Sequence, residues 1–559
     1  MNELRAFLPQ TNIAYFTMEL ALRVEVHTYS GGLGVLAGDT VRSSADLELP
    51  AVFVSLLSRA GYFRQEITED GRQIEHADPW DIDKWAHPLA AMIGVQIEDR
   101  LVWVRPWLYV HTSDVGYSVP VLLLDTDLEQ NHAQDRNLTH HLYGGDEVYR
   151  LKQELLLGVG GIRILEALSF EIGTYHLNEG HAAFATIELL KRFPRRRRQT
   201  DKTEWSYDAD RVRDLCVFTT HTPVQAGHDR FAYELVERIC TDLMPIDAIK
   251  VFAGDDRLNM TTLALNLSGY VNGVAQKHAV TAREMFPGFE VHAITNGIHV
   301  GTWAHAAFAA LYQAHYPQWK HEPEVLVRAD NLPDAELWNA REKAKADLCR
   351  LVHEQTGLEL DPSVPIIGFA RRMTGYKRPD LLFSDLGRLA AIADKHPFQL
   401  VFSGKAHPAD AAGKESLQKI HKAMRELSGR VPVAFLKNYD MALAQVLVAG
   451  ADVWLNTPLP PLEASGTSGM KAAVNGVLNL STHDGWWAEG CIEGVTGWAI
   501  TDGNDATPLY EKLEHVVLPL YYNDRSHWTW MMKQSISKIA CYFNSHRMMR
   551  RYAAEAYLR

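Results

Sequence analysis

Short hydrophobic runs alternate with longer amphipathic stretches through the second half of the chain. Four runs predict buried strands, at residues 365–369, 400–403, 431–436 and 452–456. Helical spacing predicts a long helix at 335–356 and further helices around 380–395, 413–427 and 440–448. Because strands that alternate with helices form parallel sheets, this half is predicted to be a doubly wound α/β domain.

The first half shows a similar but less regular pattern. A strand at 13–16 is followed by a glycine-containing turn at 29–39, a helix at 40–47 and a strand at 52–56. Strands at 102–104 and 119–124 and a long helix at 142–165 are also predicted, and polar residues end the strand segments at 175–181, 216–223 and 293–299. Since the carboxyl ends of parallel strands line the crevice of an open α/β sheet, these polar segments are predicted to face a ligand.

Length, charge and cysteine content narrow the class of protein. A chain of 559 residues is too long for one compact core, so two large domains are expected. The net charge of −13 argues against nucleic-acid and anionic-membrane partners, and Arg195–Arg198 are expected to form a solvated loop. The five cysteines include no closely spaced pair, which predicts free thiols and no metal site. With no signal peptide or membrane-length hydrophobic run, a cytoplasmic protein is expected.

A loop at residues 462–471, Leu-Glu-Ala-Ser-Gly-Thr-Ser-Gly-Met-Lys, combines features of a cofactor site. It lies between a predicted strand end and a predicted helix start, where free backbone N–H groups and the helix dipole favour an anion. A lysine at such a position is easier to deprotonate, and a neutral amine forms Schiff bases. An aldehyde for Lys471 and a phosphate for the loop together indicate pyridoxal phosphate. On these residues alone, an ordinary loop with a solvated lysine stays open.

A second loop concentrates positive charge after the predicted strand at 365–369. Arg371, Arg372, Lys377 and Arg378 lie within eight positions. A phosphate dianion suits such a cluster, because arginine supplies paired donors and lysine a compact charge. A solvated basic turn is the alternative. The position of this basic loop at a strand end, in an acidic chain, favours anion binding over that alternative.

These motifs, in this order, resemble those of the α-glucan phosphorylases. The resemblance rests on residues 463–471, followed by Asn475-Gly476 and Asp484-Gly485, and it extends from about Ala14 to about Phe543. Longer members of that family carry Ser-Gly-Thr-Gly-Asn-Met-Lys, whereas this chain reads Ser-Gly-Thr-Ser-Gly-Met-Lys, as in the shorter bacterial and archaeal members. The resemblance implies reversible transfer of a terminal glucose from an α-1,4-glucan to inorganic phosphate, giving α-glucose-1-phosphate with retained configuration.

The resemblance also implies roles for individual residues. Catalytic roles fall on Lys471, Arg372, Lys377 and His221. Pyridoxal 5'-phosphate, held as a Schiff base to Lys471, would be bound by Arg371, Tyr439, Gly466, Thr467 and Ser468. Sugar and phosphate would contact Gly31, Gly32, Leu33, His221, Asn272, Glu463, Ser465 and Gly466. Arg372 and Lys377 are expected to hold the substrate phosphate, Glu463 to accept hydrogen bonds from sugar hydroxyls, and Asn272 to lie near the primary hydroxyl.

The implied fold is α/β, with two Rossmann-like, doubly wound domains facing a central cleft, the GT-B architecture of glycosyltransferases. Residues 1–322 would bind glucan and 323–525 would bind pyridoxal phosphate and phosphate. Residues 526–559 would return to the first domain as a C-terminal helix. Dimers are common in the family, so a homodimer is compatible with this assignment.

Three alternatives remain at the level of sequence. A nucleotide-sugar glucosyltransferase such as glycogen synthase shares the layout but gives no reason for a reactive lysine. A glycosidase could use Glu19, Glu179 or Glu463, yet the basic clusters would then have no role. A catalytically silent glucan-binding protein is the third.

Overall fold

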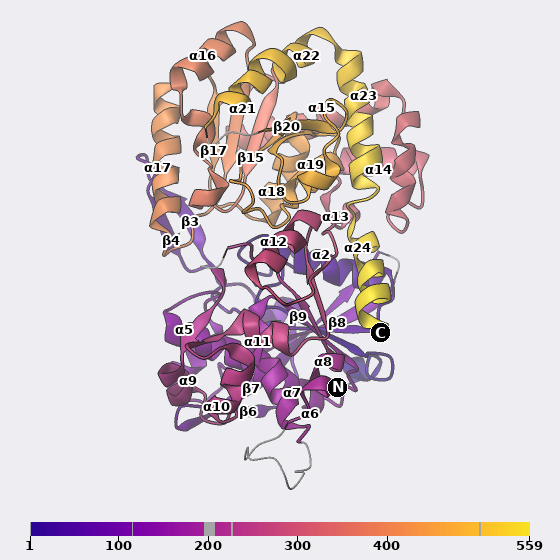
Figure 1. Ribbon diagram of the computed structural model, residues 1–559. Coiled ribbons are helices and arrows are strands. Elements are labelled where there is room, and N and C mark those ends of the chain that lie inside the picture. Colours follow the sequence, from indigo (N-terminus) through magenta and orange to yellow (C-terminus); the bar gives the residue numbers. More distant parts are fainter. Residues whose placement is uncertain (1, 115, 195–206, 225–226, 502–504, 559) are drawn as a thin grey trace.

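The computed structural model describes residues 2–114, 116–194, 207–224, 227–501 and 505–558 (Figure 1). The loop predicted at Arg195–Arg198 lies outside these residues. The fold is mixed α/β, and its two large sheets consist mainly of parallel strands. No helix in the described ranges combines the length and the apolar character that crossing a membrane requires.

The N-terminal half contains a ten-stranded sheet. Its order is β14-β13-β10-β9-β1-β2-β8-β7-β5, with β6 paired to β7. The strands from β14 to β8 are parallel, and β5, β6 and β7 are antiparallel to their neighbours. The strands are β1 (Ile13–Phe16), β2 (Ala51–Leu56), β5 (His87–Pro88), β6 (Ile93–Ile97), β7 (Arg100–Thr112), β8 (Ser118–Asp125), β9 (Thr174–Asn178), β10 (Cys216–Thr219), β13 (Tyr270–Gly273) and β14 (His292–Ala293). Two small antiparallel pairs are β3 (Arg64–Ile67) with β4 (Gln73–His76), and β11 (Arg230–Ala232) with β12 (Arg257–Asn259).

Both faces of this sheet are buried, which explains its continuous hydrophobic runs. In β1, Ala14 and Phe16 enter one hydrophobic cluster, whereas Ile13 and Tyr15 enter another. Successive side chains of a strand point to opposite faces, so each face has its own core. The helices of this half are α1 (Asn2–Arg5), α2 (Gly32–Asp46), α3 (Ile82–Trp85), α4 (Ala133–Arg136), α5 (Glu147–Leu155), α6 (Gly161–Ala167), α7 (Phe184–Lys191), α8 (Ala209–Leu215), α9 (Tyr233–Ile239), α10 (Ile246–Ala253), α11 (Met260–Asn266), α12 (Gln276–Met285), α13 (Val300–Trp303) and α14 (Ala306–His315).

The C-terminal half contains a six-stranded parallel sheet of order β17-β16-β15-β18-β19-β20. The strands are β15 (Ile366–Ala370), β16 (Gln399–Ser403), β17 (Val433–Leu436), β18 (Val453–Asn456), β19 (Leu478–Thr482) and β20 (Gly497–Ile500). All four predicted strands are confirmed. Strands β19 and β20 were not predicted from the sequence. Three of the five residues of β19 are polar, and β20 begins with a glycine, so neither segment is a continuous hydrophobic run. The Asn479 side chain of β19 is buried and donates to the Gly469 carbonyl at 3.0 Å.

Helices cover this second sheet on both sides (Figure 1). The helices of the C-terminal half are α15 (Asp334–Thr356), α16 (Leu386–Lys395), α17 (Ala411–Glu426), α18 (Met441–Gly450), α19 (Ser468–Ala473), α20 (Trp487–Gly490), α21 (Thr507–Lys512), α22 (Leu518–Asn523) and α23 (Arg525–Ser535). The last helix, α24 (Ser545–Arg551), lies beside the N-terminal half (Figure 1). Single 3₁₀ turns occur at Asn137–Thr139, Gly180–Ala182, Gly375–Lys377 and Leu381–Phe383, and a nine-residue 3₁₀ segment at Pro323–Asn331. Segments of π-helix occur at Leu156–Gly160, Leu513–Val517, Ile536–Ala540 and Tyr552–Tyr557. None of the five cysteines, all within the described ranges, forms a disulfide.

Helix α2 begins earlier than the sequence predicts. The expected helix starts at residue 40, but α2 starts at Gly32 and includes Gly34 and Gly38. A Cβ at Gly34 would lie 2.7 Å from the Glu19 carboxylate and from Tyr29, and one at Gly38 would meet the Ala21 carbonyl. These glycines lower helix propensity, but they let the helix pack closely on the chain that follows β1.

The C-terminal segment connects the two halves. In Figure 1 the yellow chain passes from α23, beside the C-terminal sheet, to α24, beside the N-terminal half. The hydroxyls of Ser43 in α2 and Ser545 in α24 lie 2.5 Å apart. The Tyr557 hydroxyl lies 2.7 Å from Nδ1 of the buried His176. Residues of α13 and α14, including Trp303 and Tyr312, pack into the hydrophobic cluster of the C-terminal half.

A buried ion-pair cluster anchors α15 to the C-terminal sheet. Asp452 accepts from Arg341 Nε at 2.8 Å, from Lys345 Nζ at 2.7 Å and from the Ile366 backbone amide at 2.8 Å. All three side chains are at most 5% exposed. Removing the carboxylate would leave two cations buried without their partner, which costs far more than losing an exposed pair.

Asp452→Ala is therefore expected to lower the free energy of unfolding by about 3–5 kcal/mol. Asp394→Ala is a matched control, because Asp394 pairs at 2.6 Å with Arg430 in a site where both side chains are at least half exposed. That change should cost at most about 1 kcal/mol. Urea unfolding followed by circular dichroism measures both. Equal effects of the two substitutions would contradict the assigned role of Asp452.

Candidate active site

Loops from both halves meet beside the strand ends of the C-terminal sheet. The Met441 amide donates to the Tyr29 hydroxyl at 2.8 Å, and the β3–β4 hairpin reaches across to contribute a Gln65 amide that donates to the Asn438 side chain at 3.0 Å. Lys405 Nζ donates to the Phe63 carbonyl at 2.8 Å. The loops after β15, β16 and β17 thus contact the N-terminal half directly.

Lys471 lies in the second turn of α19 and is 7% exposed. Its Nζ lies 3.9 Å from the centroid of the Trp303 ring, and Trp303 Nε1 donates to Asp39 at 2.9 Å. Among the described residues, no acceptor forms a hydrogen bond or ion pair with this amine. Burial lowers the pKa of Lys471 to about 8, although Asp39 opposes the shift. The structure therefore holds a buried amine that readily becomes neutral.

Three charged groups form a compact ion-paired cluster beside the lysine loop. The Glu463 carboxylate accepts from Lys377 Nζ at 2.7 Å and from an Arg371 Nη at 2.5 Å. Burial alone would raise the pKa of Glu463, but Arg371 and Lys377 outweigh it and lower this pKa to about 2. Burial and the neighbouring Arg371 lower the pKa of Lys377 to about 8, against the pull of Glu463. The cluster keeps one positive charge in excess of its carboxylate.

Arg372 does not belong to this cluster. The residue is exposed and forms no ion pair with the described residues. Although the residue as a whole is exposed, the chain packed around its guanidinium desolvates this group and lowers the pKa of Arg372. Tyr62 and Glu19, both from the N-terminal half, outweigh this effect and raise the pKa. Arg372 therefore lies at the junction of the halves, while Lys377 is already paired. The sequence grouped Arg372 with Lys377 for phosphate, and that assignment stays a prediction.

Several polar atoms around the lysine loop lack partners. Arg371 Nε and Ser465 Oγ are buried and make no hydrogen bond with the described residues. Gly466 adopts a left-handed φ of 85°, which a residue with a side chain rarely adopts, and Thr467 precedes α19. Buried donors without acceptors cost free energy, so this arrangement suits an anionic group that accepts from them.

Two other residues assigned to the cofactor lie at the edge of this group. The Tyr439 side chain is half-buried, and its pKa is raised by burial and by Asp440, while the nearby Arg371 opposes the shift. Ser468 Oγ accepts from Trp454 Nε1 at 3.0 Å, which fixes the start of α19 against β18. The positive charge of Arg371 acts on Tyr439, whereas the Ser468 side chain is used within the fold.

The glycine turn of the N-terminal half is built on Glu19, which the sequence analysis named only as a carboxylate for the alternative glycosidase function. Its carboxylate accepts from the Ser30 amide at 2.6 Å, the Gly31 amide at 3.0 Å and the Tyr143 hydroxyl at 3.1 Å. A Cβ placed at Gly31 or Gly32 would meet no atom within 4 Å, so open space borders this turn and the adjoining Leu33. The signal was available, because Glu19 follows β1 at a strand end.

His221 follows the end of β10 and contacts Asn178 and Glu179 at the end of β9. Its Nε2 lies 2.6 Å from Asn178 Oδ1, and its backbone amide donates to Glu179 at 2.8 Å. Burial lowers the pKa of His221 to about 3, so the imidazole is neutral. Glu179 has a positive φ of 74°, a strained conformation that is concentrated at functional sites.

Asn272 lies apart from these groups and is fully buried. Its amide donates to the Tyr552 hydroxyl at 2.9 Å, and its Oδ1 accepts from Thr219 Oγ1 at 2.9 Å. The side chain is used to hold the C-terminal segment against the sheet. The predicted sugar contact of Asn272 therefore stays a prediction without support from this geometry.

A neutralisable buried lysine, unpaired donors and excess positive charge, set on a parallel α/β fold, define an enzyme whose site takes an anionic group. Residues 228–490 match the model of the family described as carbohydrate phosphorylase. The chain is 39% identical to maltodextrin phosphorylase of Thermococcus litoralis, over 98% of this chain and 70% of that protein. It is 36% identical to glycogen phosphorylase of Mycobacterium tuberculosis strain H37Rv, covering 98% and 71%, and 35% identical to glycogen phosphorylase of Aquifex aeolicus, covering 98% and 86%. The chain belongs to the carbohydrate phosphorylase family.

Proposed function

We propose that this protein is an α-1,4-glucan phosphorylase. It transfers the terminal glucose of a glucan to inorganic phosphate and releases α-glucose-1-phosphate with retained configuration, in a reversible reaction. The relatives are named maltodextrin and glycogen phosphorylase. The observation that carries the proposal is the buried Lys471 amine, with a pKa of about 8, in a loop that also holds Ser465, whose Oγ is buried and has no partner among the described residues. Arg371 pairs with Glu463 of the same loop, and its Nε is likewise buried without a partner among the described residues.

The residues present fit pyridoxal 5'-phosphate. Lys471 supplies the amine, and Arg371 and Ser465 supply buried donors that lack acceptors. Tyr439 and the loop residues Gly466, Thr467 and Ser468 complete the proposed cofactor site. When bound, the cofactor contributes a phosphate whose pKa near neutrality suits proton exchange with the substrate phosphate.

The chain's own residues account for the handling of charge. The Arg372 guanidinium pairs with no carboxylate among the described residues, so it can donate to a phosphate that lies at the junction of the two halves. Lys377 now pairs with the Glu463 carboxylate. When sugar hydroxyls donate to this carboxylate, Lys377 can add a second contact to the phosphate. Two cations positioned on one anion lower the electrostatic cost of bringing two phosphates together.

The N-terminal half supplies the sugar side of the site in this proposal. Neutral His221 donates from Nε2 to Asn178 Oδ1, so its Nδ1 can accept a hydrogen bond from a sugar hydroxyl without adding charge. The open turn at Gly31, Gly32 and Leu33 leaves room for a ligand beside backbone amides. Excluding water and orienting the sugar are the tasks that this half would perform.

We further propose that the two sheets form two Rossmann-like, doubly wound domains that face a central cleft, as in GT-B glycosyltransferases. The division is 1–322, 323–525 and 526–559, the last segment returning to the first domain. The parallel strand order of each sheet and the contacts of Ser545 and Tyr557 with the N-terminal half support it. A cytoplasmic homodimer is compatible with this assignment.

Purified protein incubated with a maltodextrin and inorganic phosphate is expected to release α-glucose-1-phosphate at a rate that requires phosphate. Coupling the product to a dehydrogenase measures the rate. Glucose released without phosphate would indicate a glycosidase. Activity with a nucleotide-activated glucose and no phosphate dependence would indicate the synthase class. Glucan binding with no turnover would indicate a silent binding protein.

A further inference from the structure

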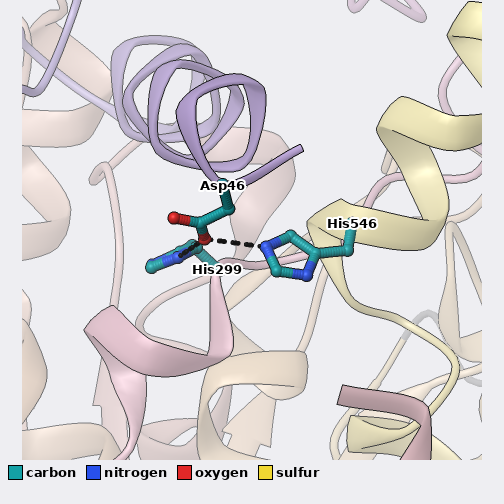
Figure 2. Close-up of side chains that lie close together, drawn as sticks. All are labelled: Asp46, His299 and His546. Carbon is teal, nitrogen blue, oxygen red and sulfur yellow. Dashed lines mark hydrogen bonds and ion pairs between the residues drawn. The ribbon is translucent and has the colours of Figure 1, made fainter. Parts of the chain in front are cut away.

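A second cluster of titratable side chains lies away from the lysine loop. Asp46 ends α2, His299 immediately precedes α13, and His546 lies in α24 (Figure 2). Nε2 of each histidine lies 2.8 Å from the same oxygen, Asp46 Oδ2. The three atoms lie within 4.8 Å of one another. Two imidazoles and one carboxylate thus converge from three segments that are far apart in the sequence.

The outer nitrogen of each imidazole has its own partner. His546 Nδ1 lies 3.2 Å from the His321 carbonyl, and His299 Nδ1 lies 2.7 Å from Thr302 Oγ1. A carbonyl only accepts, so Nδ1 of His546 carries a proton. Its Nε2 then either carries a second proton toward Asp46 or presents a lone pair to a cation. Histidines that bind metals in proteins commonly donate their other N–H in this way.

The cluster borders a cavity of about 190 Å³. Asp46, His299 and Thr302 line it, together with His111 and His321. The cationic residues at its wall are already paired with carboxylates, Arg42 with Asp39 and Lys320 with Asp114, which also lines the cavity. The cavity has room for water to act as a further ligand. His546, by contrast, is 1% exposed, so the cluster has one closed and one open side.

We propose that Asp46 Oδ2, His299 Nε2 and His546 Nε2 bind a divalent transition-metal ion, with Zn²⁺ as the preferred ion and water from the cavity as the fourth ligand. Imidazole nitrogens and a carboxylate oxygen are ligands that suit zinc. Tetrahedral bonds of about 2.0–2.1 Å place ligand atoms about 3.3 Å apart. The distance between Asp46 Oδ2 and each histidine Nε2 is 2.8 Å, so it needs to increase by only about 0.5 Å to admit the ion.

The position of the site indicates a structural role. The ion would join α2, the start of α13 and α24. Helix α2 begins at the glycine turn, and α13 ends with Trp303, whose ring covers Lys471. Binding to the folded state alone would stabilise the return of α24 to the N-terminal half. This inference does not depend on the proposed phosphorolysis.

Titration of chelator-treated, full-length protein with Co²⁺ tests the site, because cobalt reports its ligand field in the visible spectrum. We expect ligand-field absorption that saturates at one equivalent and is displaced by Zn²⁺. One equivalent of Zn²⁺ should also raise the melting temperature. Folded wild-type protein with neither a saturating signal nor a thermal shift would overturn the proposal.

Substitutions locate the ion. His299→Ala and Asp46→Asn are expected to weaken Zn²⁺ binding by more than about tenfold, and Thr302→Val, which removes the partner of His299 Nδ1, by about tenfold. His111→Ala is the matched control, a histidine of the same cavity that should leave affinity unchanged. Affinity that is unchanged in His299→Ala would show adventitious binding at other histidines and overturn the proposal.

A second measurement uses only the wild-type protein and therefore does not depend on whether the variants fold. Carbethoxylation of wild-type histidines, followed by mass spectrometry, should show His299 protected by one equivalent of Zn²⁺ and His111 unprotected. Equal labelling of His299 with and without Zn²⁺ would contradict the proposed ligand set.

Discussion

Lys471→Ala is expected to abolish both the visible absorbance of bound pyridoxal phosphate and phosphate-dependent glucose-1-phosphate formation. The amine is the only group of the loop that can hold an aldehyde covalently, and its pKa of about 8 keeps a useful fraction neutral near pH 7. Loss of the cofactor removes an entire catalytic phosphate, so activity should fall by more than about 10³-fold. Absorbance spectra and the coupled assay on the same preparation measure the two effects.

Lys405→Ala is the matched control for this prediction. Burial also lowers the pKa of Lys405 to about 8, and the residue belongs to the same half. Its amine donates to the Phe63 carbonyl, not to the lysine loop. The control variant should therefore keep the cofactor absorbance. If Lys405→Ala lost the absorbance and Lys471→Ala retained it, the cofactor site would be assigned to the wrong lysine.

Arg372→Ala is expected to lower the phosphorolysis rate by about 10²–10³-fold while the cofactor absorbance is retained. The guanidinium has no carboxylate partner among the described residues, so its removal unpairs no buried charge. In the proposed function it stabilises the substrate phosphate, hence the loss should appear in the phosphate-dependent step. Rates measured over a range of phosphate concentrations, beside an absorbance spectrum, separate rate from cofactor content.

Two further variants bracket this result. Arg371→Ala should release the cofactor, because Arg371 faces the lysine loop and pairs with Glu463. Arg430→Ala, an exposed arginine on the same half, should change neither rate nor absorbance. Cofactor loss in Arg372→Ala, with retention in Arg371→Ala, would show that the two adjacent arginines have each other's roles.

Much of the fold follows from local pattern. The four strands predicted in the C-terminal half are present because each is a short hydrophobic run buried on both faces. The start of α2 could not be predicted in this way. Gly34 and Gly38 disfavour a helix locally, and only the close approach of Glu19, Tyr29 and Ala21 explains their presence in one. Strand β19 was not predicted because polar residues interrupt its hydrophobic run, and only the structure shows that the buried Asn479 side chain donates to the Gly469 carbonyl.

The sequence by itself determined that polar and basic loops follow the strands and that a helix begins in the loop that contains Lys471. These are consequences of residue order, since a parallel strand delivers its next residues to one edge of the sheet. Only the tertiary structure decided that Lys377 pairs with Glu463, that Asn272 is used by Tyr552, and that Trp303 covers Lys471. It alone brought Asp46, His299 and His546 together from three distant segments. The reason is that a contact between residues far apart in the sequence depends on how whole helices and sheets pack, which no local spacing encodes.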